Sequence, residues 1–216
     1  DRIEYFEIPE SDGVSYTARG NVSITEEGRL ATCGEAIYDR ENGKTTLRIK
    51  PKIIDNNQTI AGSEIFLEYD EDVLKSLFIP SEAHATHPST GIRQWTEIVD
   101  GDTLTFEDSL SFTDDMTGSI LRGFFTDGIM DSMRLEGMAT TLYHIFEDSV
   151  YQGKNEASGD TIIMNFADND LQKIFVNGGS RGTYTPDSTG ADVDGPIHYE
   201  SEDIDYDVVN EFTARH

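Results

Sequence analysis

The chain of 216 residues carries 16 lysines and arginines against 42 aspartates and glutamates, a formal net charge of -26. This charge repels nucleic-acid phosphates and anionic membrane surfaces, so we expect no nucleic-acid partner. Cys33 is the single cysteine, which excludes an intrachain disulfide and a cysteine-based zinc cluster. No apolar run approaches the roughly 18 residues that cross a bilayer as a helix.

Strand-like alternation begins at the first residues, DRIEYFEI, and turn-forming residues recur about every 8 to 12 positions along the chain. Helical periodicity does not persist beyond about two turns anywhere. The pattern predicts an all-β chain. Because the sequence starts without methionine inside a strand-like stretch, we expect residues 1–216 to form a single domain that is the mature part, or a fragment, of a longer protein.

A hairpin-like unit recurs along the chain. GSEIFLEYDEDVLKSLFIP, from Gly62, matches GDTIIMNFADNDLQKIFVN, from Gly159, at an offset of 97 without a gap, and a third copy begins at Gly118 at an offset of 56. Weaker echoes start at Gly34 and Glu202. The spacing is too uneven for a strict solenoid, so the repeat predicts hairpins stacked in series.

Within each unit, apolar residues two positions apart share one face of a strand. The stretches 70–73, 126–129 and 167–170 contain the Asp, Asn and Gly residues that tight hairpin turns need. Stacking such hairpins produces an elongated sandwich or roll with one continuous apolar inner surface. That surface is either a packed core or, if the two sheets splay apart, a binding groove.

The segments GEAIYD, LRIKPKI, the Gly62 unit, MTGSILRGFFTDGIMDSMRLEGMATTLY and ASGDTIIMNFADNDLQKIFVNGGSRGTY, in this order, resemble the periplasmic OstA-like proteins of lipopolysaccharide transport, the LptA group. The resemblance also extends to the amino-terminal domain of their outer-membrane partner. It covers about residue 15 to the end. The insert 87–109 and the acidity depart from the shorter family members.

The resemblance implies a β-jellyroll of stacked antiparallel hairpins, open like a V or U, in the periplasm of a Gram-negative envelope. It implies a bridge that conveys lipopolysaccharide toward the outer membrane with the lipid A acyl chains in an apolar groove. Such a bridge is not an enzyme and needs no cofactor or metal. The implied partners are lipopolysaccharide or lipid A and other jellyroll proteins of the bridge, and the strand-like chain ends permit head-to-tail self-association.

The lipid-binding residues expected from this resemblance are the inward positions of the three matched hairpins. They are Ile65, Leu67, Tyr69, Leu77, Ile79, Phe125, Met133, Leu135, Ile162, Met164, Phe166, Ile174 and Val176.

An alternative function stays open: an extracellular β-sandwich that binds a glycan or a protein through acidic loops. An enzyme is less favoured, because no hydrolase, zinc-protease or phosphate-loop motif is present. His84 and His87 are three apart in a strand and should point to opposite faces, so we expect no shared metal. Trp95, the single tryptophan, is expected to cap the core.

Overall fold

The computed structural model describes residues 2–7, 14–26, 28–55, 57–167, 170–187, 195–207 and 212–213. About 85% of the described residues are in strands, and none of them is in a helix. The prediction of an all-β chain is therefore confirmed. Consistently, the described residues contain no helix long and apolar enough to cross a membrane.

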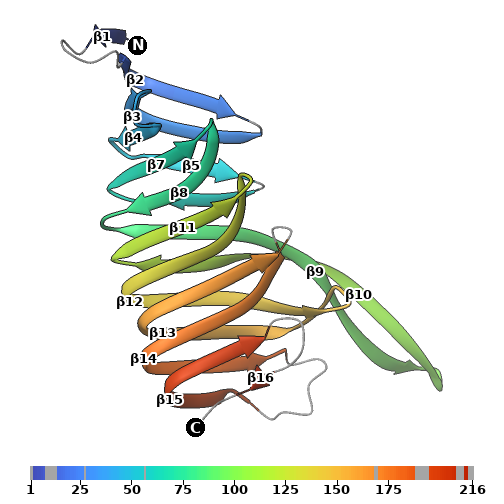
Figure 1. Ribbon diagram of the computed structural model, residues 1–216. Coiled ribbons are helices and arrows are strands. Elements are labelled where there is room, and N and C mark those ends of the chain that lie inside the picture. The colour runs from blue at the N-terminus through green and yellow to red at the C-terminus, as the bar shows by residue number, and fades with distance from the viewer. Residues whose placement is uncertain are drawn as a thin grey trace.

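Sixteen strands make up the structure. They are β1 (Arg2–Glu7), β2 (Val14–Glu26), β3 (Arg29–Asp39), β4 (Lys44–Arg48), β5 (Lys52–Asp55), β6 (Gln58–Ala61), β7 (Glu64–Asp70), β8 (Val73–Ile79), β9 (Ala83–Val99), β10 (Asp102–Gly118), β11 (Ile120–Thr126), β12 (Ile129–Glu147), β13 (Val150–Ala167), β14 (Asp170–Pro186), β15 (Ile197–Asp207) and β16 (Phe212–Thr213). All belong to one hydrogen-bonded sheet, stacked from β1 at one end to β15 and β16 at the other (Figure 1).

The sheet is folded into two halves because the long strands change partners along their length. Strand β3 pairs with β4 through residues 35–39 and with β5 through residues 30–32. Strand β12 pairs with β11 through residues 129–136 and with β10 near residue 141. We call the half that contains β4, β7, β8 and β11 sheet A, and the half that contains β5 and β6 sheet B. The long strands β12, β13, β14 and β15 contribute residues 129–136, 161–167, 170–177 and 203–207 to sheet A, and residues 139–147, 150–158, 180–186 and 197–201 to sheet B. Side chains from both halves meet in one apolar core, so the halves pack face to face.

The bend between the halves occurs where the strand register shifts. In β12 the shift spans Gly137 and Met138, and in β14 it spans Gly178 and Gly179. All four residues have positive φ, between 53° and 80°. Glycine accepts this conformation at little cost, and the extra residues of a bulge bend the strand. The corners line up from strand to strand and form one closed edge of the stack.

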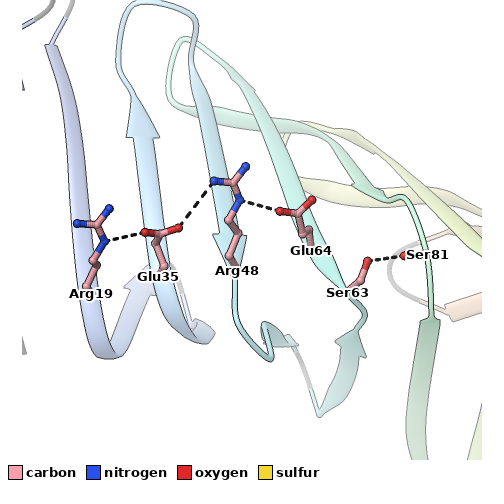
Figure 2. Close-up of polar contacts among 6 residues, drawn as sticks. All are labelled: Arg19, Glu35, Arg48, Ser63, Glu64 and Ser81. Carbon is pink, nitrogen blue, oxygen red and sulfur yellow. Dashed lines mark hydrogen bonds and ion pairs between the residues drawn. The ribbon is translucent and has the colours of Figure 1, made fainter.

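A ladder of ion pairs follows this corner across β2, β3, β4 and β7 (Figure 2). Arg19 Nε lies 2.7 Å from Glu35 Oε1, Arg48 Nη1 lies 3.7 Å from Glu35 Oε2, and Arg48 Nε lies 2.7 Å from Glu64 Oε1. Hydrogen bonding to Arg19, helped by the charge of Arg48, holds the pKa of Glu35 below its usual range. The ladder therefore contributes to holding neighbouring strands in register.

The hairpin turns have the backbone that tight connections require. Glu71 and Asp72 join β7 to β8, and Asp127 and Gly128 join β11 to β12; all four have positive φ. Positive φ at both central residues is typical of the type I′ turn, whose twist matches that of paired strands. Residues 168 and 169, in the third predicted turn, lie outside the described residues.

The insert forms an arm, defined here as residues 88–113 of β9 and β10, which projects away from the stack (Figure 1). Its base is fixed to β12 and to Asp187, the residue that follows β14. Arg93 Nε lies 2.9 Å from Oδ2 of the buried Asp187, and the Phe112 ring stacks on His144 at 4.1 Å. His144 in turn donates its backbone N–H to Asp114 Oδ1 at 2.9 Å.

Candidate functional site

The structure brings the thirteen predicted lipid-binding residues together on the inner face of sheet A. Eleven of them are buried in the single apolar core, and Tyr69 and Phe166 are partly buried and pack against it. Ile65, Ile162 and Met164 have no accessible surface at all. Along these strands the inner surface is therefore covered by the chain's own side chains.

Two apolar rows cross sheet A perpendicular to its strands. The first row runs through Leu47, Ile65, Ile79, Leu121, Leu135, Ile162, Val176 and Ile204. The second row runs through Leu67, Leu77, Gly123, Met133, Met164 and Ile174. The first row spans eight strands, or about 34 Å at a strand spacing of about 4.8 Å. The core is thus continuous along most of the stack.

Three members of the first row are absent from the predicted set: Leu47, Leu121 and Ile204, all buried. The repeat contained a signal for one of them, because Leu121 falls on Ile65 at the offset of 56. At the same offset Gly123 falls on Leu67. The third hairpin therefore continues the first row with Leu121 but has no side chain in the second row, at Gly123.

The buried apolar residues of sheet B are mostly small: Ala31, Cys33, Ala83, Ala85, Ala139 and Ala157, with Ile53 and Ile60 on its two shortest strands. The larger Val22, Met116, Tyr143 and Tyr199 are only partly buried and pack against them. Bulky aliphatic side chains of sheet A thus face a wall of alanine. Burial raises the pKa of the Cys33 thiol above its ordinary value, which keeps the thiol protonated near neutral pH.

A polar cluster interrupts the apolar core near β12–β15. The Tyr199 hydroxyl donates to Asn155 Oδ1 at 2.5 Å, and Tyr143 also hydrogen-bonds to Asn155. Burial raises the pKa of both tyrosines, so their hydroxyls stay protonated. These hydrogen bonds offset the cost of burying an amide in the interior.

Side chains cross between the two halves at the edge opposite the corner. Arg29 of β3, in sheet B, donates to the carbonyl oxygen of Gly128 in the β11–β12 turn at 3.3 Å, and its guanidinium lies 5.8 Å from the Phe125 ring centroid. The Tyr69 hydroxyl donates to Glu26 Oε2 at 3.4 Å. Burial, followed by the charge of Glu26, raises the pKa of Tyr69 to about 12. At this edge the two halves are joined by side-chain contacts of this kind, whereas at the corner they are joined by the continuous backbone of the long strands.

Two grooves lie on the outer faces. One, of about 750 Å³, crosses sheet B and is lined by hydroxyl and charged side chains that include Asp115, Thr140 and Arg181. The other, of about 470 Å³, crosses sheet A over Phe66, Phe78 and Phe124. The sequence analysis predicted neither groove, because it treated the outward-facing residues of the strands only as solvent-exposed.

His84 and His87 contact different carboxylates, and His144 shares the partner of His87, with its Nδ1 2.7 Å from Asp114 Oδ1. His84 Nε2 lies 2.6 Å from Asp115 Oδ2, and His87 Nδ1 lies 3.7 Å from Asp114 Oδ2. Within the described ranges no group of three or more His, Cys, Asp or Glu side chains is arranged to hold a metal ion. The prediction that Trp95 caps the core is wrong: it lies on the arm and stacks on Phe106 at 5.7 Å. The insert forms its own ribbon rather than folding over the stack.

Comparison with known proteins identifies no relative: no family model, no curated protein and no solved structure matches this chain.

Proposed function

We propose that the chain is a lipid-conveying scaffold of a Gram-negative periplasm, an OstA-like jellyroll that passes lipopolysaccharide toward the outer membrane. The observation that carries the proposal is the pair of apolar rows across sheet A, because acyl chains need a continuous apolar track to cross an aqueous compartment. Each methylene kept out of water is worth about 0.8 kcal/mol.

In this proposal the two halves of the sheet separate to admit the acyl chains. The corner acts as the hinge, because its backbone is continuous, and the contacts of Arg29 and Tyr69 at the opposite edge break. Acyl chains then replace the alanine wall as the packing partner of sheet A. Apolar surface stays out of water in both states, so the exchange costs far less than exposing the core.

Assembly follows from the ends of the stack. Among the described pairings, residues 22–26 of β2 pair only with β3. Unpaired strand edges accept a strand of another chain. Head-to-tail association, with a second copy or with another jellyroll of the bridge, would extend the track. Because the charge of -26 opposes it, association should strengthen as salt shortens the Debye length.

Photo-crosslinking tests the lipid proposal. A photoreactive residue at position 164, inside the core, should crosslink to lipopolysaccharide. The same residue at position 163, which faces outward on the same strand, should not. Cys33 supplies an independent readout in the unlabelled chain: its reaction with a thiol reagent should accelerate when lipopolysaccharide separates the halves. A folded protein with no crosslink from position 164 and unchanged Cys33 reactivity would contradict the proposal.

The second candidate is an extracellular β-sandwich that binds a glycan or a protein on its outside. The complete burial of Ile65, Ile162 and Met164 favours it, since a closed interior leaves only outer surfaces for ligands. The same crosslinking experiment separates the two functions, because this candidate requires a silent position 164.

A further inference from the structure

The outer face of sheet A carries aromatic side chains that neither the core nor the lipid proposal uses. Phe66 on β7 and Phe78 on β8 are directly opposed, with ring centroids 6.0 Å apart and planes at 29°. Phe124 on β11 lies beside them and is 46% exposed. Together with Lys44, Glu68 and Arg122 they line the groove of about 470 Å³, which we call the aromatic groove.

The aromatic groove has a local excess of positive charge on a strongly acidic chain. Arg122 lies over the Phe78 ring at 4.4 Å and is 3.7 Å from Glu136 Oε1. Arg134 Nε lies 2.7 Å from the same oxygen, so two guanidinium groups share one carboxylate. Lys44 Nζ pairs with Glu68 at 3.0 Å. The residues that line the groove thus include two cations, Lys44 and Arg122, and one carboxylate, Glu68, whereas the whole chain has a net charge of -26.

The floor of the aromatic groove offers side chains but no free backbone. Its strands β4, β7, β8 and β11 are each hydrogen-bonded to a neighbour on both sides. An extended peptide consequently cannot bind by adding a strand, which is the usual way a sheet captures a peptide. A ligand must instead be recognised through ring faces, charges and hydroxyl partners.

We propose that the aromatic groove binds an acidic oligosaccharide. The apolar faces of the sugar rings lie on Phe66, Phe78 and Phe124, as rings do in pockets that combine aromatic walls with a few polar groups. A sugar carboxylate pairs with Arg122, whose planar guanidinium matches a carboxylate in two hydrogen bonds.

Sugar hydroxyls find both donors and acceptors at the rim. Lys44 donates, and Glu68 accepts as a carboxylate, because Lys44 and then Ser76 hold its pKa below the usual range. One register row through Thr46, Phe66, Phe78 and Arg122 spans four strands, about 14 Å at about 4.8 Å per strand. That length accommodates several sugar rings. The site lies on the opposite side of the sheet from Leu67 and Leu77 and does not depend on the lipid proposal.

Calorimetric titration of the full chain with tetragalacturonate at low ionic strength tests this site. The neutral galactose tetrasaccharide should bind at least about tenfold more weakly, because it lacks the charge-assisted pair with Arg122. Arg122→Gln should weaken tetragalacturonate binding by about tenfold as well. Phe124→Ala should also weaken it. Both side chains are substantially exposed, so the variants should fold, and circular dichroism checks that they do.

Arg181→Gln is the matched control, because it makes the same charge change on the outer face of sheet B, where Arg181 pairs with Glu200 at 3.2 Å. It should leave binding unchanged. Equal binding of the neutral tetrasaccharide, equal loss in Arg181→Gln, no binding at millimolar oligosaccharide, or equally tight binding of tetraglutamate would overturn the proposal. A lipopolysaccharide crosslink at position 164 is independent of all these outcomes.

Discussion

Sheets A and B line the same core with side chains of different size. Sheet A contributes leucine, isoleucine and methionine from eight strands, whereas most of the fully buried residues of sheet B are alanines and Cys33, joined by Ile53 and Ile60 and by a few larger, partly buried side chains. Small residues on one side let the backbone of sheet B approach the bulky side chains of sheet A closely. Sheet A therefore holds most of the apolar surface, while sheet B sets the width of the interior. Substitutions on the two sheets should therefore fail in different ways.

The largest effect should come from a charge in sheet A. Met164→Asp buries a carboxylate without a partner, and together with the lost methionine packing we expect at least about 5 kcal/mol of destabilisation, comparable to the total stability of many domains. Urea unfolding followed by circular dichroism measures it. Ile163→Asp, on the outer face of the same strand, is the control and should cost much less. Similar losses for both would contradict the assignment of faces.

Removing bulk from sheet A should be the next most costly change. Leu135→Ala leaves a cavity in the middle of the first apolar row, and we expect a loss of about 2–5 kcal/mol. The midpoint of urea unfolding should fall while its slope stays constant. A loss below about 1 kcal/mol would mean that sheet B closes onto the vacated space.

Adding bulk to sheet B should have a smaller but definite cost. Ala157→Leu inserts three carbon atoms into the wall that faces the aliphatic rows, and overpacking of this kind costs about 1–3 kcal/mol. Thermal unfolding of this variant beside Leu135→Ala tests whether the asymmetry is real. If Ala157→Leu stabilises the protein, the interior has unfilled room and the alanine wall is not a constraint.

The smallest effect should appear at alkaline pH and involves both sheets. Burial raises the pKa of Cys33 above its ordinary value and that of Tyr69 to about 12 in the folded chain. A raised pKa means that the folded state retains protons that the unfolded state has lost. The unfolding free energy should therefore be constant below about pH 9 and fall as pH rises through the folded values, by at most about 1.4 kcal/mol per pH unit for each group.

Urea titrations between pH 8 and pH 11 measure this dependence. Cys33→Ala removes the earlier part of the decline and leaves the part due to the buried tyrosines Tyr69, Tyr143 and Tyr199 at higher pH. A stability that rises with pH in this range would show that neither group is buried as the structure describes.

Period-two alternation was enough to predict an all-β chain and to place Ile65, Leu67, Met164 and Val176 on one face. Each of these side chains alternates with polar or outward neighbours, and a strand allows no other arrangement. The turn at Asp127 and Gly128 was equally visible, since that dipeptide suits positive φ. The sequence predicts strand faces and turns because both depend only on residues that are neighbours along the chain.

The sequence did not predict which strands pair. Leu135 lies opposite Ile162, and Leu121 lies opposite Ile79, only because corners and bulges elsewhere set the register of these strands. For the same reason the aromatic groove was not predicted. Phe66 and Phe78 are separated by one turn, but Arg122 reaches Phe78 only because β11 pairs with β8 across a long insertion. Trp95 was misplaced because nothing in its own sequence shows that the insert leaves the stack.

By itself, then, the sequence determined the strand content, the repeated hairpin, the inward-facing residues of sheet A and the acidic surface, all of which follow from alternation and composition. Only the tertiary structure decided that alanines of sheet B oppose these residues, that Arg29 and Tyr69 close the free edge, and that Arg122 lies over Phe78 in a groove shared with Phe66 and Phe124. These features join residues distant along the chain. Their contacts depend on how the sheet folds at its corner, a long-range property that no local pattern contains.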